Sequence, residues 1–197
     1  MIKAGLDIGS RSIEFVVLND GQPVCMEKTE TGINPLSQIK DFLSRPYDTL
    51  VATGYGRGLV QKNYNCQAVT EIKAYATAVK HFHPDLRAIL DIGGQDTKAI
   101  LLDEQGLMKK FEMNDKCAAG TGKFLEIMAM TLGVTLEEFG PLALSSKDDL
   151  TINNTCTVFA ESEVVSLVTQ GYAHSQIAHA IHLKESKPVL NIFLPFL

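Results

Sequence analysis

The sequence predicts a mixed α/β protein of two similar halves, each built on the same three-stranded unit. The segments Asp7-Ile8-Gly9-Ser10 and Asp91-Ile92-Gly93-Gly94 each join two apolar runs, and a polar turn and a further strand follow each. Apolar residues recur at helical spacing near residues 71–81, 124–132 and 159–168. The 197 residues are enough to bury one large core or two small ones.

The two units have the same order of elements. In the first, a strand ends at Asp7, a second apolar run covers residues 13–18, a turn ends at Gly21, and a third strand lies near residues 23–29. The second unit repeats this order from Asp91 through residues 99–102, Gly106 and residues 107–113. Two unrelated hairpins that share an aspartate and a glycine are the alternative, and the matching order of elements favours duplication.

The chemistry of these turns favours phosphate binding. Glycine lets the backbone approach a phosphate closely, and the N–H groups of the turn can point at its oxygens. An aspartate at the end of a buried strand can hold a hydrated Mg²⁺ ion or orient a water. Two such hairpins facing each other would clamp a polyphosphate from both sides.

The segment between the copies predicts a glycine-rich loop and a helix. A strand near residues 51–53 runs into Gly54-Tyr55-Gly56-Arg57-Gly58. The helix at residues 71–81 is expected to end before Pro84, which cannot continue it. Glu71 either faces a ligand cleft or complements the helix dipole as an ordinary first-turn acid.

Two of the four cysteines are expected at helix starts. Cys117 precedes the helix near residues 124–132, and Cys156 follows the capping residues Asn153, Asn154 and Thr155. A helix N-terminus lowers a thiol pKa and favours an anion such as a thiolate-ligated iron–sulfur cluster. No Cys-x-x-Cys pair occurs, which argues against a zinc ribbon or a ferredoxin loop.

Three interpretations of the cysteines remain open from the residues alone. A cubane cluster usually takes four thiolates, so two per chain suffice only if two chains share it. Cys25 and Cys66 would otherwise complete four ligands within one chain, although neither has the helix-start setting. The third interpretation is four unrelated thiols.

Composition and charge exclude several classes of protein. The net charge of −5 argues against binding of nucleic-acid phosphates as the main function. No 18-residue apolar run occurs, and the first residues lack the layout of a signal peptide. We therefore expect a cytoplasmic protein with reduced cysteines and no membrane partner.

Together these motifs resemble one known family. It comprises the ATP-dependent activators of 2-hydroxyacyl-CoA dehydratases and the related ATPase subunits of benzoyl-CoA reductases. The resemblance covers about residues 2–182. The segments that carry it are Asp7-Ile8-Gly9-Ser10, Ala52-Thr53-Gly54-Tyr55-Gly56-Arg57, Asp91-Ile92-Gly93-Gly94-Gln95-Asp96, Asn114-Asp115-Lys116-Cys117-Ala118-Ala119-Gly120-Thr121-Gly122 and Phe159-Ala160-Glu161-Ser162-Glu163-Val164.

The resemblance implies an actin-like, sugar-kinase-like or Hsp70-like ATPase fold with two ribonuclease-H-like halves. It also implies a homodimer with one bridging 4Fe–4S cluster, for which Cys117 and Cys156 match the family's ligands. ATP would change the angle between the two cluster-bearing helices. One electron would then pass to the dehydratase or reductase partner, and a ferredoxin or flavodoxin would reload the cluster.

The resemblance also assigns roles to the residues of both hairpins. Asp7 and Asp91 would be the catalytic residues nearest a hydrated Mg²⁺ ion. Gly120, Thr121 and Gly122 would open the Cys117 helix and couple cluster and nucleotide. The remaining nucleotide-binding residues are Gly9, Ser10, Arg11 and Ser12 in the first hairpin, and Gly93, Gly94, Gln95 and Asp96 in the second.

The end of the sequence departs from the family pattern. The family continues with more helix and then a strand whose Gly-Gly motif holds the adenosine. Here residues 175–184 look like the start of that helix, and Pro188 is expected to stop it. We expect a first half at residues 1–85, an incomplete second half at 86–185, and an atypical apolar tail at 186–197 from truncation or a frameshift. The alternative for the tail is a substitute strand over an exposed sheet edge.

Other functions remain as alternatives to the activator ATPase. A small-molecule kinase of the same superfold, of the amino-sugar type, would use the hairpins without a cluster. An inactive nucleotide-binding remnant would fit the expected C-terminal departure. A zinc-bridged dimer would use the same two cysteines.

Overall fold

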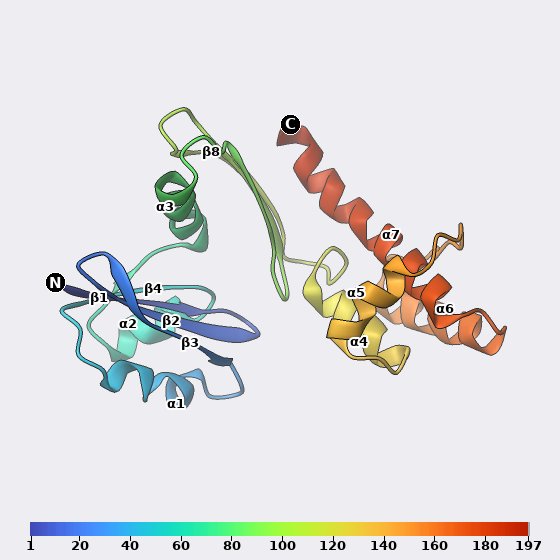
Figure 1. Ribbon diagram of the computed structural model, residues 1–197, viewed down its shortest axis with the longest axis horizontal. Helices are drawn as coiled ribbons and strands as arrows, with labels where there is room; N and C mark the ends of the chain where they lie inside the picture. Colours follow the sequence, from blue (N-terminus) through green and yellow to red (C-terminus); the bar gives the residue numbers. More distant parts are fainter. Residues whose placement is uncertain (197) are drawn as a thin grey trace. The chain divides into compact units, whose positions relative to one another are not determined.

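The computed structural model describes residues 1–196, which form two compact units (Figure 1). Unit 1 comprises Met1–Leu86 together with Leu102–Met108. Unit 2 comprises Arg87–Leu101 and the part of the described chain that follows Met108. Each unit carries one of the two predicted hairpins.

Unit 1 is built on a mixed five-stranded sheet with the order β3-β2-β1-β4-β5. Its first three strands are antiparallel neighbours, and β4 and β5 add in parallel on the other side of β1. The strands are β1 (Ile2–Ile8), β2 (Ser12–Asn19), β3 (Gln22–Glu30), β4 (Thr49–Thr53) and β5 (Gln67–Ala68).

One face of this sheet makes the core of unit 1. Alternate residues of β1 and β2 are buried there, as the period of two in a half-covered strand requires. The rings of Phe15 and Phe42 stack with centroids 5.4 Å apart. The helical segments of the unit are α1 (Pro35–Ile39), η1 (Phe42–Ser44), α2 (Arg57–Asn63) and α3 (Glu71–Phe82). Helix α3 confirms the helix predicted near residues 71–81, and Glu71 lies in its first turn beside the Thr70 N-cap.

Unit 2 joins a three-stranded sheet to a group of four helices. The sheet has the order β6-β7-β8, which confirms the second predicted three-stranded unit. Its elements are β6 (Ala88–Ile92), β7 (Thr97–Leu102), β8 (Met108–Asn114), α4 (Gly122–Thr131), α5 (Leu136–Leu144), α6 (Thr157–Thr169) and α7 (His174–Phe193). The helices share one apolar core that includes Phe124, Met128, Phe139, Val164 and Ile177.

The structure corrects the expectation that the last helix ends at Pro188. The helix continues through this proline to Phe193, and a short 3₁₀ turn, η2 (Leu194–Phe196), follows. A proline inside a helix removes one N–H donor and crowds the preceding turn. Tertiary packing supports this position, because Pro188 lies directly against Gly120 and the Phe196 side chain is buried.

No single helix of the described residues has the length and apolar composition needed to cross a membrane. Helices α4 and α5 meet that requirement only when they are taken together, across a bend of 84°. Several residues of both helices, including Phe124 and Phe139, are buried in the core of unit 2.

Candidate nucleotide site and cysteine loops

The first hairpin turn lies between β1 and β2 and is closed by the backbone. The Gly9 N–H donates to the Ser12 carbonyl over 3.0 Å, and Asp7 pairs with Glu14 across the strands. A Cβ atom at Gly9 would lie 3.0 Å from that same carbonyl oxygen. Glycine is therefore needed here because the turn leaves little room for a side chain.

The second hairpin turn repeats this geometry in unit 2. The Gly93 N–H donates to the Asp96 carbonyl over 2.8 Å, and Asp91 pairs with Lys98 across β6 and β7. A Cβ atom at Gly93 would lie 2.7 Å from Asp96 Oδ1. The same register and the same turn hydrogen bond confirm the predicted duplication.

The remaining predicted hairpin residues lie in or beside the two turns. Ser10 and Gly94 are half-buried, and Arg11 and Gln95 are exposed at the turns. The Ser12 hydroxyl donates to Glu14 Oε1 over 2.7 Å, so in this structure it faces along β2.

A glycine-rich loop from the end of β4 closes around Asp7. Gly54 has a φ of +84°, and a Cβ atom there would lie 2.2 Å from Asp7 Oδ1. The Gly56 N–H donates to the Ile8 carbonyl over 2.9 Å. The sequence predicted a glycine-rich loop but not its contact with Asp7, which depends on the parallel pairing of β1 with β4.

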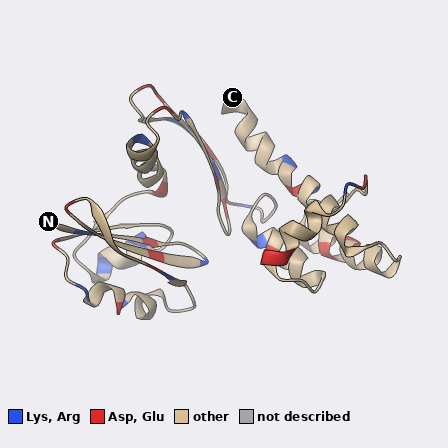
Figure 2. Ribbon diagram, in the orientation of Figure 1, with Lys and Arg blue, Asp and Glu red and all other residues tan. Residues whose placement is uncertain are grey.

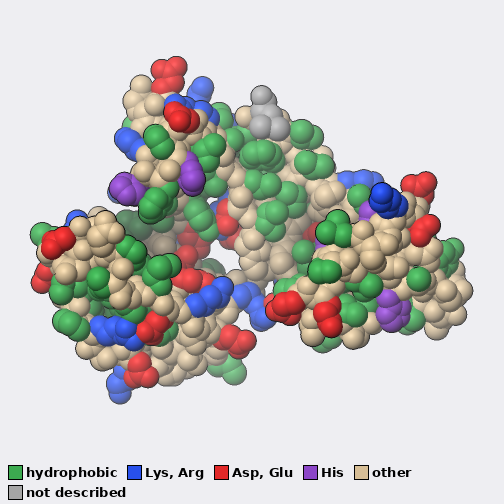
Figure 3. Space-filling view, in the orientation of Figure 1, with side chains coloured by type: hydrophobic (Ala, Val, Ile, Leu, Met, Phe, Trp, Pro, Cys, Tyr) green, Lys and Arg blue, Asp and Glu red, His purple; other side chains and the backbone are tan. Residues whose placement is uncertain are grey.

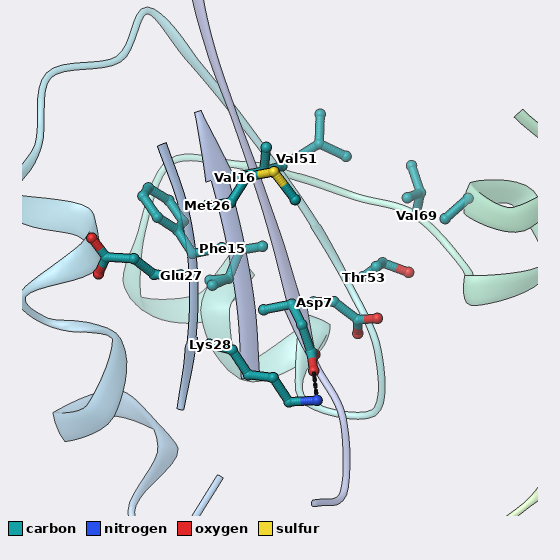
Figure 4. A pocket seen from close by; sticks show the side chains of 13 residues that line it. Asp7, Phe15, Val16, Met26, Glu27, Lys28, Val51, Thr53 and Val69 are labelled. Atoms are coloured by element: carbon teal, nitrogen blue, oxygen red, sulfur yellow. Dashed lines mark ion pairs between the residues drawn. The ribbon is translucent and has the colours of Figure 1, made fainter. Parts of the chain in front are cut away.

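A cavity of about 530 Å³ lies along the face of the unit 1 sheet that carries Asp7 (Figure 4). The Asp7 carboxylate lies near the Thr53 side chain, and Lys28 forms a 3.2 Å ion pair with Glu14 at the same end (Figure 4). The Thr53 hydroxyl oxygen is buried with no hydrogen-bond partner among the described residues. The apolar part of the lining includes Val16, Met26, Val51 and Val69.

Lys98 is a site residue that the sequence analysis missed. Its side chain is buried, and its ammonium lies 2.6 Å from Asp96 Oδ1 and 3.3 Å from Asp91 Oδ2. The first hairpin has Glu14 at the equivalent register position, so the two copies differ in charge there. The feature of the sequence that could have indicated these ion pairs is the position of Lys98 two residues after Asp96.

The start of helix α4 rests on the second hairpin. Gly122 N–H donates to Gly93 O over 2.9 Å, and Lys123 N–H donates to Gly94 O over 2.8 Å. The Thr97 hydroxyl donates to Gly120 O. The predicted residues Gly120, Thr121 and Gly122 are therefore brought onto the hairpin by backbone hydrogen bonds, while Thr121 itself is buried.

The structure corrects the position of one cysteine. Cys117 does not lie at a helix start, because residues 115–121 form a loop and α4 begins only at Gly122. Cys156 is the N-cap residue of α6, as expected. Both thiols are exposed, and Val158 and Phe159 beside Cys156 are exposed by 66% and 63%.

The other two cysteines differ from this pair in place and in chemistry. Cys25 and Cys66 both lie in unit 1, and both are half-buried against its core. Burial raises the pKa of both thiols above the ordinary value, which disfavours the thiolate that a metal requires.

Hydrogen bonds fix the loop that carries Cys117 and the loop that leads to Cys156. The Asn114 amide donates to Cys117 O over 3.1 Å and to Ala119 O over 2.7 Å. Glu163 on α6 accepts from the backbone N–H groups and side-chain amides of Asn153 and Asn154, over 2.7–3.2 Å. Burial of Glu163 opposes its ionisation, but these hydrogen bonds outweigh burial and lower its pKa.

The donor set of the described residues fits only part of a cluster site. Residues 1–196 contain no group of three or more His, Cys, Asp or Glu side chains that could hold a metal ion. Two exposed thiols on fixed loops supply half of the four thiolates that a cubane cluster usually takes. The described residues of one chain therefore do not supply a complete four-thiolate site.

The surface of both units is mixed in character. Acidic and basic residues are interspersed along the ribbon rather than gathered by sign (Figure 2). Apolar side chains lie between polar ones on the visible face of unit 2 (Figure 3).

Comparisons with known proteins identify the family. Residues 43–187 match the model of the BadF/BadG/BcrA/BcrD ATPase family. The activator of lactoyl-CoA dehydratase from Anaerotignum propionicum is 40% identical over 195 residues, which cover 93% of this chain and 74% of that protein. The (R)-2-hydroxyglutaryl-CoA dehydratase activating ATPase of Acidaminococcus fermentans is 35% identical over 198 residues, covering 95% and 75%.

Solved structures of such activators share the fold. The activator of the 2-hydroxyisocaproyl-CoA dehydratase from Clostridium difficile, solved with bound ADPNP, matches with a TM-score of 0.85 and 36% identity. The match covers 97% of this chain and 74% of that one. Component A of the A. fermentans dehydratase matches with a TM-score of 0.86 and 32% identity, covering 98% and 77%. The resemblance and the actin-like α/β fold class are confirmed, and this chain belongs to the BadF/BadG/BcrA/BcrD ATPase family.

Proposed function

We propose that this protein is an ATP-dependent activator that passes single electrons to a 2-hydroxyacyl-CoA dehydratase or a benzoyl-CoA reductase type of partner. The observation that carries the proposal is the pair of equivalent hairpin turns, of which the second supports the helix start that follows Cys117. Similarity to several dehydratase activators supports the same conclusion.

Both hairpins contact the phosphates of ATP in this proposal. Asp7 and Asp91 would hold a hydrated Mg²⁺ ion, and the turns at Gly9 and Gly93 would bring backbone N–H groups close to phosphate oxygens. The Lys98 ammonium, 3.3 Å from Asp91 Oδ2, holds this carboxylate in place beside the turn. Residues 1–85 and 86–185 then correspond to the two ribonuclease-H-like halves.

Cys117 and Cys156 of two copies would together hold one 4Fe–4S cluster. When bound, the cluster would supply a one-electron carrier, with a ferredoxin or flavodoxin as the proposed electron donor. The exposed Val158 and Phe159 beside Cys156 support a second copy as the partner of this surface, since apolar residues favour the centre of an interface.

Three measurements on the anaerobically reconstituted protein test this function. Titration calorimetry measures ATP binding, iron and sulfide analysis measures the cluster, and light scattering measures the dimer. We expect Cys117→Ser and Cys156→Ser to lose iron and to weaken the dimer, and Cys25→Ser, the matched control in unit 1, to keep both. Iron loss in the Cys25 variant would contradict two ligands per chain. Phosphoryl transfer to an amino sugar, in place of ATP hydrolysis, would identify a kinase.

A further inference from the structure

Two adjacent residues of helix α7 contact two different loops of unit 2. Lys184 Nζ donates to the Asn153 carbonyl over 2.7 Å, in the loop that leads to Cys156. The Glu185 carboxylate accepts from the Gly120 N–H, at the end of the loop that carries Cys117. Glu185 is only 6% exposed, so this contact is shielded from water.

Gly120, the residue that Glu185 contacts, is joined to the second hairpin. The Thr97 hydroxyl on β7 donates to Gly120 O, and the following helix start donates to the carbonyls of Gly93 and Gly94. Gly120 has a φ of +80°, and a Cβ atom there would lie 3.2 Å from Pro188 Cβ on α7. The loop therefore lies in direct contact with α7 at Gly120, and a shift of the hairpin can be passed to α7 there.

Asn153, the residue that Lys184 contacts, lies in the loop that leads to Cys156. Glu163 holds the backbone N–H groups of Asn153 and Asn154, while Lys184 holds the Asn153 carbonyl. Cys156 follows two residues later as the N-cap of α6. Lys184 is therefore the contact through which α7 can move this loop.

We propose that Lys184 and Glu185 are positioning residues that link the second phosphate hairpin to the Cys156 loop, so that both cysteine loops respond together when nucleotide binds. The proposal rests on the proposed function, because it takes ATP as the ligand of the hairpin. Cys117 needs no such link, since its own loop ends on the hairpin.

A second route between the hairpin and Cys156 passes through the core. Helices α4 and α6 pack together there, and Phe124, Met128, Ala160 and Val164 are all buried in this core. Contiguous packing alone does not establish that coupling follows it, so the two routes must be separated by substitution. Lys184 lies outside this core, which makes its replacement a selective test.

The test measures how fast iodoacetamide alkylates each exposed cysteine in the apo protein, with and without Mg-ATP, by mass spectrometry. Lys184→Met removes the ammonium and keeps the side-chain stem, and Lys184→Arg restores a donor. Glu185→Leu removes the acceptor, and Glu185→Gln keeps one. Lys187→Met, at an exposed lysine of the same helix, is the matched control.

In the unsubstituted protein, ATP should change the alkylation rates of Cys117 and Cys156 by at least about fivefold, the lower end of typical coupling. Lys184→Met and Glu185→Leu should lose the change at Cys156 and keep it at Cys117. The other three variants should keep both changes.

The possible failures are distinguishable. If Lys184→Met and Glu185→Leu keep the response at Cys156, the linkage through α7 is wrong and the core route carries the coupling. If ATP binds by calorimetry but changes neither alkylation rate, the linkage is also wrong while the ATPase function stands. If calorimetry detects no ATP binding at all, the proposed function fails first.

Discussion

Replacing Glu185 by glutamine should abolish a specific pH dependence of the free energy of unfolding. Burial raises the pKa of Glu185 from its ordinary value of 4.5 to about 7, although the Gly120 and Thr121 N–H groups act in the opposite direction. Glutamine has nearly the same shape, keeps an oxygen that can accept from Gly120, and cannot ionise. The variant therefore isolates the ionisation of this one side chain.

The sign of this pH dependence follows from proton binding in the folded and unfolded states. Below pH 4.5 the carboxyl is protonated in both the folded and the unfolded chain, so its ionisation costs no stability. Between pH 4.5 and about 7 the unfolded chain releases this proton and the folded chain keeps it, so stability falls as the pH rises. A pKa difference of this size is equivalent to about 3 kcal/mol, lost in full above pH 7.

The surroundings of Glu185 are mostly apolar. The carboxyl lines a cavity of about 190 Å³ with Ile92, Leu125, Val189 and the ring of His182. His182 Nδ1 lies 2.8 Å from the Ala178 carbonyl of its own helix. It is the other titratable side chain of that lining, so the same titration in a His182→Asn background separates its contribution.

Urea unfolding followed by circular dichroism between pH 4 and pH 9 measures the effect. The difference in unfolding free energy between Glu185→Gln and the unsubstituted protein should be nearly constant below pH 4.5 and should shift in favour of the variant by about 3 kcal/mol by pH 8. Glu138→Gln is the control of opposite sign, because hydrogen bonds from Thr135 lower the pKa of Glu138. A pH-independent difference for Glu185→Gln would refute the reasoning.

Three further predictions follow from other contacts. Gly54→Ala should weaken ATP binding by calorimetry, because the new Cβ would clash with both the Asp7 carboxylate and the Ile8 backbone. An unchanged affinity would exclude Asp7 from the site. Lys98→Met should lower the free energy of unfolding by about 3 kcal/mol in urea, since it leaves two carboxylates without their shared ammonium; a neutral effect would contradict a structural ion pair. Glu163→Gln should destabilise the protein at pH 7 but less at pH 3. The lowered pKa of Glu163 contributes stability that is lost as the pH falls. An equal loss of stability at both pH values would argue against an ionised Glu163.

The hairpins and most helices were predictable from the sequence because their determinants are local. The turn at Gly93 closes on Asp96, and the glycine is needed for contacts within that same turn. Helix α3 ends before Pro84, as the sequence predicted. The duplication was visible for the same reason.

The features that the sequence did not reveal depend on distant residues. Helix α7 continues through Pro188 where Gly120 supports it, and Glu185 reaches an N–H group 65 residues earlier in the chain. The Thr121 N–H donates to Ala118 O over 3.0 Å, a turn that delays α4 and leaves Cys117 in a loop. The ion pairs of Lys98 required the register of β6 and β7.

The division of the chain between the units also bears on how the protein is synthesised. Leu102–Met108 belong to unit 1, although the chain on both sides of them belongs to unit 2. The side chain of Lys80 on α3 packs over Gly106 within that returning segment. On the ribosome, unit 1 therefore cannot be completed until part of unit 2 has already emerged, so strict domain-by-domain folding from the N-terminus does not apply. For the same reason no single cut of the chain releases either unit intact.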